Sequence, residues 1–172
     1  MSVVDITETR QYLTFRLGAE IFAIDVAQVR EVLDLTNITH IPRTPELMTG
    51  VINLRGTVVP VVDLRQCLEM SKTETTRNTR IVVVEVALDG EPTIIGALTD
   101  SVEEVIDFDP EQIQAAPRIG TQVCVDFIKG MGKRENDLIM ILDVDRVFSA
   151  GEVKSASLQS ANLEVAPAES RL

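Results

Sequence analysis

The sequence of 172 residues is poor in aromatic side chains, which make up 3% of it, and it has no tryptophan. Hydrophobic residues nevertheless reach 45%, so valine, isoleucine and leucine must fill the interior. Because β-branched side chains favour strands, we expect a chain made mainly of β-structure with short helices. A chain of this length forms either one compact domain or two small domains in close contact.

Histidine and cysteine are also scarce, which limits the kinds of site that can form. The single histidine, His40, excludes a multi-histidine metal site, and Cys67 and Cys124 are too few and too far apart for a zinc site. Both cysteines lie in apolar contexts without CxxC spacing, so we predict two buried thiols in a reducing compartment. We predict no metal site and no cofactor.

Basic residues are outnumbered by acidic ones, 16 to 27, which gives a formal net charge of −11. That charge repels nucleic-acid phosphates and anionic lipid, so neither is an expected partner. The N-terminus lacks the pattern of a signal peptide, and apolar runs such as Val58–Val62 and Leu138–Leu142 have only the length of a strand. We therefore expect a cytoplasmic protein without direct membrane insertion.

Alternating polar and apolar residues and turn residues place the expected elements along the chain. Strands are predicted at Gln11–Leu17, Glu20–Asp25, Gly50–Arg55, Thr57–Asp63, Arg80–Leu88, Pro92–Thr99, Phe127–Gly132 and Leu138–Asp143. Short amphipathic segments, the first of them a helix, are predicted from helical spacing of Val26, Val29, Val32 and Leu33, and of Val102, Val105 and Ile106. Pro60 cannot donate to a ladder, so its strand is expected at a sheet edge or bulge.

The second half of the chain repeats the first. Leu47–Gly50 matches Phe127–Gly130, and Val61–Leu64 matches Ile141–Val144, at one common offset in sequence number and without a gap. We therefore predict an internal duplication whose two units pack together.

The repeat also sets the expected domain boundaries. The units cover about 11–70 and 79–149, and the polar stretch Ser71–Asn78 connects them. Residues 1–10 and 150–172 are expected to be flexible, with at most a partly helical C-terminal tail.

Each half carries one aspartate directly after a strand, Asp63 and Asp143. A shared-proton dyad of these carboxylates would make the protein an acid hydrolase. The bulky or charged residues that follow each aspartate oppose so close an approach, and N-caps of short helices are the preferred interpretation. The glycines of Gly130–Lys133 do not have the spacing of a phosphate loop. No catalytic residue is predicted.

The most specific stretch of the chain is residues 50–65, Gly-Val-Ile-Asn-Leu-Arg-Gly-Thr-Val-Val-Pro-Val-Val-Asp-Leu-Arg. It strongly resembles the signature of the CheW family, the coupling proteins of bacterial chemotaxis. The resemblance extends over residues 11–149, through segments such as Phe22–Val26, Val29–Val32 and Ile95–Val102. It implies two five-stranded SH3-like β-barrels packed around a hydrophobic groove.

The same resemblance implies a function and two partners. The chain would be a non-catalytic adaptor that couples the cytoplasmic tips of methyl-accepting chemoreceptors to the histidine kinase CheA, at membrane receptor arrays. It would bind the kinase through the kinase's regulatory domain, which has the same fold. The implied receptor-binding residues are Glu31, Arg55, Ile81, Gly96, Val102 and Val105. The implied kinase-binding residues are Leu13, Val26, Val29 and Gly50.

Arg55 is expected at a hairpin tip beside Gly56, where its fork of donors suits a carboxylate or a helix surface. Valines at helical spacing more often belong to a core than to an interface. Three other functions stay open: a coupler in a related pathway for surface motility or development, the acid hydrolase, and a small-ligand carrier that uses the groove.

Overall fold

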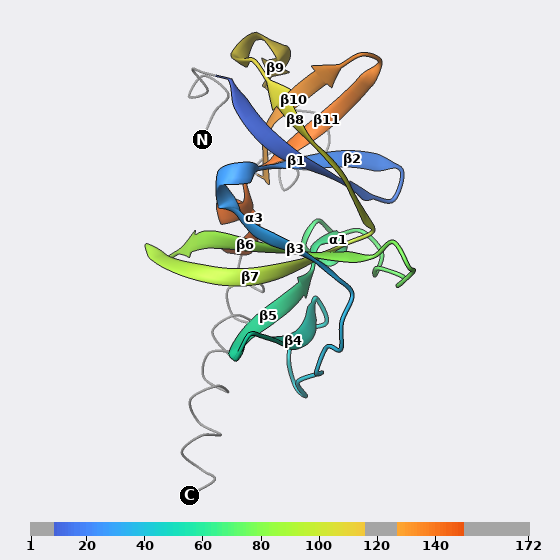
Figure 1. Cartoon of the computed structure of the whole chain (residues 1–172), viewed down its shortest axis with the longest axis vertical. Coiled ribbons are helices and arrows are strands. Elements are labelled where there is room, and N and C mark those ends of the chain that lie inside the picture. The colour runs from blue at the N-terminus through green and yellow to red at the C-terminus, as the bar shows by residue number, and fades with distance from the viewer. Residues whose placement is uncertain (1–8, 116–126, 150–172) are drawn as a thin grey trace, which may run out of the picture.

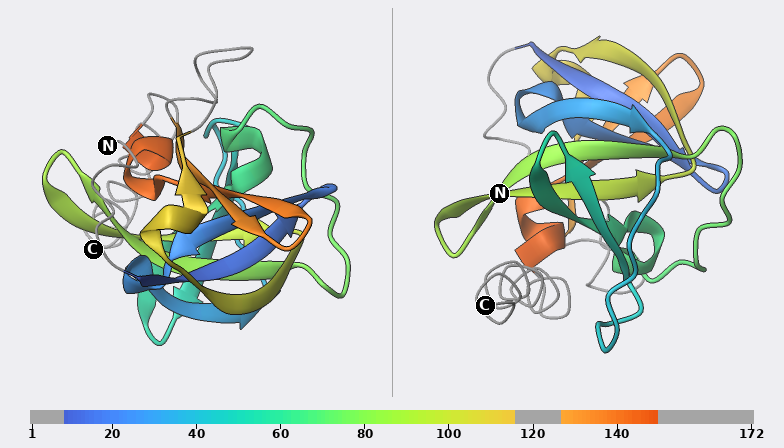
Figure 2. Two further views of the ribbon diagram at one scale, coloured as in Figure 1. Left: turned by 90° about the horizontal axis from the view of Figure 1, so that it is seen from above. Right: turned by 60° about the horizontal axis from the view of Figure 1, so that its bottom comes forward.

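The computed structural model describes residues 9–115 and 127–149, and it contains two curled sheets that lie one above the other (Figures 1 and 2). Each sheet forms a small SH3-like barrel. Barrel A has the strand order β8-β1-β2-β11-β10-β9, and barrel B has the order β3-β6-β7-β5-β4. The predicted mainly-β fold with two such barrels is confirmed, and barrel A adds the very short β9 to its longer strands.

The strand bounds agree closely with the predicted ones. Barrel A consists of β1 (Arg10–Leu17), β2 (Glu20–Asp25), β8 (Ser101–Phe108), β9 (Ile113–Gln114), β10 (Ile128–Arg134) and β11 (Asp137–Leu142). Barrel B consists of β3 (Val29–Asp34), β4 (Met48–Leu54), β5 (Thr57–Asp63), β6 (Arg80–Leu88) and β7 (Glu91–Thr99). The short helices are η2 (Val26–Gln28), α1 (Leu64–Cys67), η3 (Pro110–Gln112) and α3 (Val144–Ser149).

Two predicted amphipathic segments are strands instead. Only η2 is helical after Asp25, and the residues from Val29 onward form β3, which pairs with β6 at the edge of its sheet. Val102, Val105 and Ile106 lie in β8, which pairs with β1. Strand pairing with an apolar neighbour therefore prevails over a spacing that fits a short helix.

The strand of Pro60, predicted at a sheet edge or bulge, is not at an edge, because β5 lies between β7 and β4. Its ladder with β4 does contain a register shift, between Met48 and Gly50. Pro60 pairs with Val51 of β4, but the ladder between β5 and β7 begins only at Val61. The missing N–H of proline therefore costs no hydrogen bond to β7, and an interior strand tolerates it.

Each barrel combines strands from both predicted repeats. β1 and β2 join β8–β11 in barrel A, whereas β3–β5 join β6 and β7 in barrel B. In equivalent positions, β5 runs parallel to β7 and β11 runs parallel to β2. The backbone N–H of Asp63 donates to Leu47 O at 2.8 Å, and that of Asp143 donates to Phe127 O at 2.9 Å. The two repeats thus have the same local geometry and exchange their strands.

The chain passes between the barrels twice. In the first crossing η2 connects β2 to β3, and in the second Asp100 connects β7 to β8. The crossings lie on opposite sides of the molecule, the first beside α3 and the second near α1 (Figure 1). We refer to them below as the first and the second crossing.

The largest apolar core lies between the barrels and holds them together. It includes Phe15 and Phe22 from barrel A, Val62 and Val84 from barrel B, and Phe148 from α3. Smaller cores fill barrel A around Tyr12 and Phe108, and barrel B around Val59 and Ile81. None of the helices in 9–115 and 127–149 is long and apolar enough to cross a membrane.

Candidate partner-binding surfaces

The tip of the β4–β5 hairpin presents Arg55 to solvent, as the sequence predicts. Arg55 and Gly56 form a two-residue turn with φ values of 51° and 88°, typical of the turns that match strand twist. Asn53 Oδ1 accepts a hydrogen bond from Gly56 N at 2.8 Å and holds the turn. Arg55 is therefore carried on a well-defined tip.

Arg55 reaches across the open side of barrel B to Glu31 on the edge strand β3. The two side chains form an ion pair, in which Arg55 is 72% exposed and Glu31 27% exposed. The hydrogen bond to Glu31 raises the pKa of Arg55, which stays charged. The pair borders a groove of about 460 Å³ whose floor includes Val59, Val83 and Ile94. The structure thus brings together two of the predicted receptor-binding residues.

Ile81 and Gly96, from the same predicted set, lie inside barrel B. Ile81 is fully buried, and a Cβ on Gly96 would stand 2.9 Å from Ile81 Cγ2 and 3.3 Å from Val61 Cγ2. Both residues form part of the wall of the barrel, and neither is available on its surface for direct contact with a partner. Any influence they have on a partner passes through the packing beneath the groove.

Val102 and Val105 lie on barrel A, on β8 directly after the second crossing. Val105 is 50% exposed, and Val102 is half-buried against the core between the barrels. The residues predicted to bind receptor are therefore divided between the two barrels.

The predicted kinase-binding residues are only partly gathered. Val26 and Val29 flank the first crossing, half-buried against the core between the barrels. Leu13 is buried in β1 and pairs with Val105. Gly50 lies in β4, where an added Cβ would stand 2.3 Å from Thr39 O.

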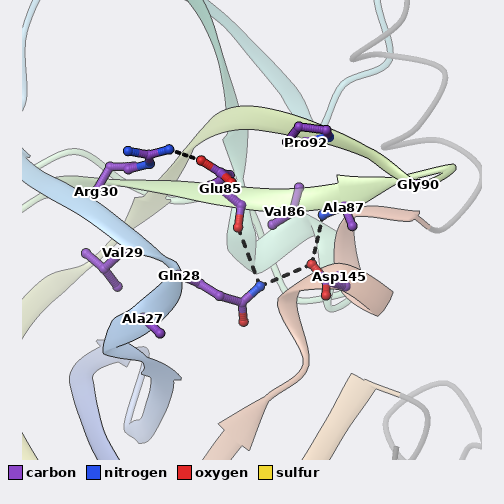
Figure 3. A pocket seen from close by; sticks show the side chains of 10 residues that line it. All are labelled: Ala27, Gln28, Val29, Arg30, Glu85, Val86, Ala87, Gly90, Pro92 and Asp145. Carbon is purple, nitrogen blue, oxygen red and sulfur yellow. Dashed lines mark hydrogen bonds and ion pairs between the residues drawn. The ribbon is translucent and has the colours of Figure 1, made fainter.

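The first crossing is fixed by a carboxylate that the sequence reasoning missed. Asp145 of α3 accepts hydrogen bonds from Gln28 Nε2 at 3.1 Å and from the backbone N of Ala87 at 3.0 Å (Figure 3). Beside them, Arg30 forms an ion pair with Glu85. These residues line a second groove, of about 570 Å³. The internal repeat could have pointed to Asp145, because this residue occupies in the second repeat the position that Arg65 occupies in the first.

The second crossing is fixed by an ion pair that sequence reasoning also missed. Arg65 of α1 donates from Nε to Asp100 Oδ1 at 2.8 Å and from its terminal nitrogen to Oδ2 at 2.5 Å. Gly18 N, in the β1–β2 turn, donates to the same carboxylate at 2.7 Å. The hydrogen bond from Arg65 lowers the pKa of Asp100, and partial burial opposes this shift.

The two aspartates of the alternative dyad are N-caps, as predicted. Asp63 accepts from Arg65 N at 3.1 Å and from the backbone and hydroxyl of Thr73. Asp143 accepts from Arg146 N at 3.2 Å. Cys67 is buried, whereas Cys124 lies outside the described residues. Of the residues predicted to be flexible, 1–10 and 150–172, Arg10 begins β1, and 1–8 and 150–172 lie outside the described residues. Within 9–115 and 127–149, no group of three or more His, Cys, Asp or Glu side chains is placed to hold a metal ion.

The two barrels pack closely and have open grooves on their flanks. Several of their polar side chains cap helices or fix the crossings between the barrels. This arrangement is that of a binding module of the adaptor class. The CheW-like domain model matches residues 11–152. The chain therefore belongs to the CheW-like family, whose members are adaptors and not enzymes.

Comparisons with individual proteins agree with this family. The chain is 33% identical over 153 residues to the chemotaxis protein CheW of Bacillus subtilis, covering 88% of this chain and 95% of that one. It is 29% identical over 147 residues to the chemotaxis protein CheW of Klebsiella aerogenes, covering 86% of each. The crystal structure of the scaffolding protein TtCheW from Thermoanaerobacter tengcongensis superposes with a TM-score of 0.73 at 32% identity, covering 83% of this chain and 90% of that one.

Proposed function

We propose that this protein couples the cytoplasmic tips of methyl-accepting chemoreceptors to the histidine kinase CheA, in a cytoplasmic array beneath the membrane. The observation that carries the proposal is the Arg55–Glu31 pair, held at an exposed hairpin tip beside a groove with an aliphatic floor. Receptor tips are helical, and aliphatic walls with a flanking charge suit helix-in-groove recognition.

The kinase is proposed to bind on a different surface, around the first crossing. Val26 and Val29 are only half-buried there, and the adjoining groove carries polar groups from β3, β6 and α3. The kinase's regulatory domain is the proposed contact. The two grooves meet at Arg30, so receptor and kinase would bind side by side on one small protein.

The first test removes Arg55. Arg55→Ala should lower receptor-dependent kinase activation in a reconstituted array of receptors, kinase and this chain, because the guanidinium fork on the hairpin tip is lost. The fold should persist, since Arg55 is 72% exposed and exposed ion pairs add little to stability. Kinase activation per receptor, measured as phosphate transfer, reports the effect.

The matched control is Lys133→Ala. Lys133 is exposed on β10, in the β10–β11 hairpin of barrel A, so this variant removes a surface positive charge from a hairpin that carries none of the proposed contact residues. Equal activation by wild type and Arg55→Ala would contradict the proposal. A pull-down from the native host identifies the kinase, and a kinase of a related motility or developmental pathway would place the chain there.

A further inference from the structure

The two crossings between the barrels are built as a pair. Arg65 and Asp145 occupy equivalent positions in the two repeats, and each is the second residue of the short helix that follows a hairpin. Each side chain leaves its own barrel and bonds to the crossing. The carboxylate of each bonded pair also accepts from a backbone N–H of a hairpin on the opposite barrel, Asp100 from Gly18 N and Asp145 from Ala87 N. At the second crossing the pair is Arg65 and Asp100, with Gly18 N; at the first it is Asp145 and Gln28, with Ala87 N.

The bonds at the second crossing are directional. Arg65 donates to both oxygens of Asp100, and Asp100 N donates to Arg16 O at 3.1 Å, so α1, the crossing and β1 are fixed to one another. The side chains of Arg65 and Asp100 are only 18% and 23% exposed. The apolar core between the barrels stabilises their contact but does not favour one orientation. A bidentate ion pair is directional, so it fixes the angle and the register of one barrel on the other.

The bonds at the first crossing also fix the two barrels to each other, and Asp145 is the charged group that makes them. A single oxygen of Asp145 accepts from Gln28 of η2 and from Ala87 N of β6, and Gln28 also donates to Glu85 O at 3.5 Å (Figure 3). The helix α3 on barrel A is thereby bonded to the start of barrel B.

Each crossing leads directly to proposed contact residues, and the first leads both to Val29 of the kinase set and to Glu31 of the receptor set on β3. Val102 and Val105 closely follow Asp100 on β8, and the receptor set is completed by Glu31 and Arg55 on barrel B. Val26 and Val29 flank Gln28 in the proposed kinase surface.

Resting on the proposed function, we propose that these bonded pairs are positioning residues with separate tasks. Arg65 and Asp100 hold β8 in the orientation that aligns Val102 and Val105 with barrel B for the receptor. Asp145 and Gln28 hold Val26 and Val29 for the kinase. Arg65 and Asp100 lie outside the receptor groove, whereas Asp145 and Gln28 also line the groove beside the proposed kinase surface.

The test compares two isosteric substitutions in the full-length chain, Asp100→Asn and Asp145→Asn. Affinities are measured by calorimetry for a receptor cytoplasmic tip and for the kinase's regulatory domain. Asp100→Asn should weaken receptor binding by roughly three- to tenfold and leave kinase binding nearly unchanged. Asp145→Asn should do the reverse. Arg65→Lys, which keeps the charge, should retain more receptor affinity than Arg65→Gln.

Hydrogen exchange of the unbound protein gives a readout that needs no partner. Asp100→Asn should speed exchange at Gly18 and at the start of β8, and Asp145→Asn should speed it at Ala87 and the start of β3. Selective losses of affinity with these local changes support the proposal. Equal weakening of both partners, or local changes without selective loss, overturns it. A wild-type chain that binds neither partner overturns the proposed function itself.

Discussion

At the scale of single residues, Gly50 of the signature motif occupies a position with no room for a side chain. Its α-carbon faces the backbone of Thr39, which forms an isolated bridge with Val51, and a Cβ would also stand 2.7 Å from Ile38 Cγ2. The glycine is required there because another segment of backbone passes too near for any side chain. A substitution of Gly50 therefore disturbs the fold as well as the proposed kinase-binding surface.

Gly50→Ala should lower the free energy of unfolding by about 3 kcal/mol, since Thr39 must move to admit the methyl group. Gly56→Ala is the matched control, because Gly56 has φ 88° but nothing within 4 Å of an added Cβ. Its cost should be about 1 kcal/mol, from backbone conformation alone. Urea denaturation of the two variants measures both values, and equal losses would refute the close-contact explanation.

Asp100 should make stability depend on pH. Its pKa is lowered in the folded state, so its contribution is present above the unfolded-state pKa of about 3.9 and is lost as pH falls through the folded value. Asp100→Asn should therefore be less stable than wild type at pH 7, and the difference should shrink below about pH 4. Denaturation at both pH values tests this, and a difference that persists unchanged in acid would count against it.

The sequence allowed Arg55 to be placed on a hairpin tip, because a residue beside glycine between two apolar runs has few alternatives. It did not reveal Glu31 as its partner. Glu31 was expected on a helix, and only the pairing of β3 with β6 brings its carboxylate to the open side of barrel B. Arg65 and Asp100 were missed for the same reason, since the connector and the strands β6 and β7 lie between them in the chain.

At the scale of elements, strands followed by a clear turn or preceding a crossing were predictable, and the segments that follow the two crossings, β3 and β8, were not. β2, β5 and β6 have the predicted bounds. β3 was missed because its outward Val32 is 39% exposed, which spoils the alternation of a half-buried strand and leaves a spacing that also fits a helix. Edge strands are where local pattern is weakest, since tertiary pairing supplies only one neighbour.

The helix α3 has only six residues, far fewer than an isolated helix needs for stability. It persists because Val144, Val147 and Phe148 are fully buried in the core between the barrels. Phe148→Ala should therefore lower the free energy of unfolding by about 3–4 kcal/mol. Thermal or urea denaturation gives the value.

Ser149→Ala is the control for α3, because Ser149 is exposed and its hydroxyl donates to Arg146 O of the same helix at 3.3 Å. It should change stability by less than about 0.5 kcal/mol. Similar stabilities of the Phe148 and Ser149 variants would show that α3 does not anchor the barrels.

At the scale of the whole molecule, the duplication was visible in the sequence but the exchange of strands was not. The common offset shows that two hairpins are alike, and it carries no information about which neighbour each one joins. The parallel contacts of β5 with β7 and of β11 with β2 settle that choice. The predicted units 11–70 and 79–149 thus each supply strands to both barrels.

Because the two repeats exchange strands, we predict that the protein stays folded as one particle after the connector Ser71–Asn78 is cleaved. A specific protease site inserted between the exposed Glu74 and Thr75, then cleaved, should leave two fragments that co-elute as one folded particle in size-exclusion chromatography. Strands of each fragment complete a sheet in the other, so the fragments should part only in denaturant. Two separately folded peaks in native buffer would contradict the exchanged topology.

The two crossings also fix the order in which the molecule can be completed during translation. Barrel B is one continuous piece of chain from Val29 to Thr99, whereas barrel A begins with β1 and ends with β11. Synthesis from the N-terminus therefore delivers β1 and β2 first, lets barrel B close next, and supplies β8 and β11 last. The β1–β2 hairpin is therefore synthesised before the strands β8 and β11 that pair with it. Until those strands are made, barrel B is the part of the fold available to cover Phe15 and Phe22 of this hairpin.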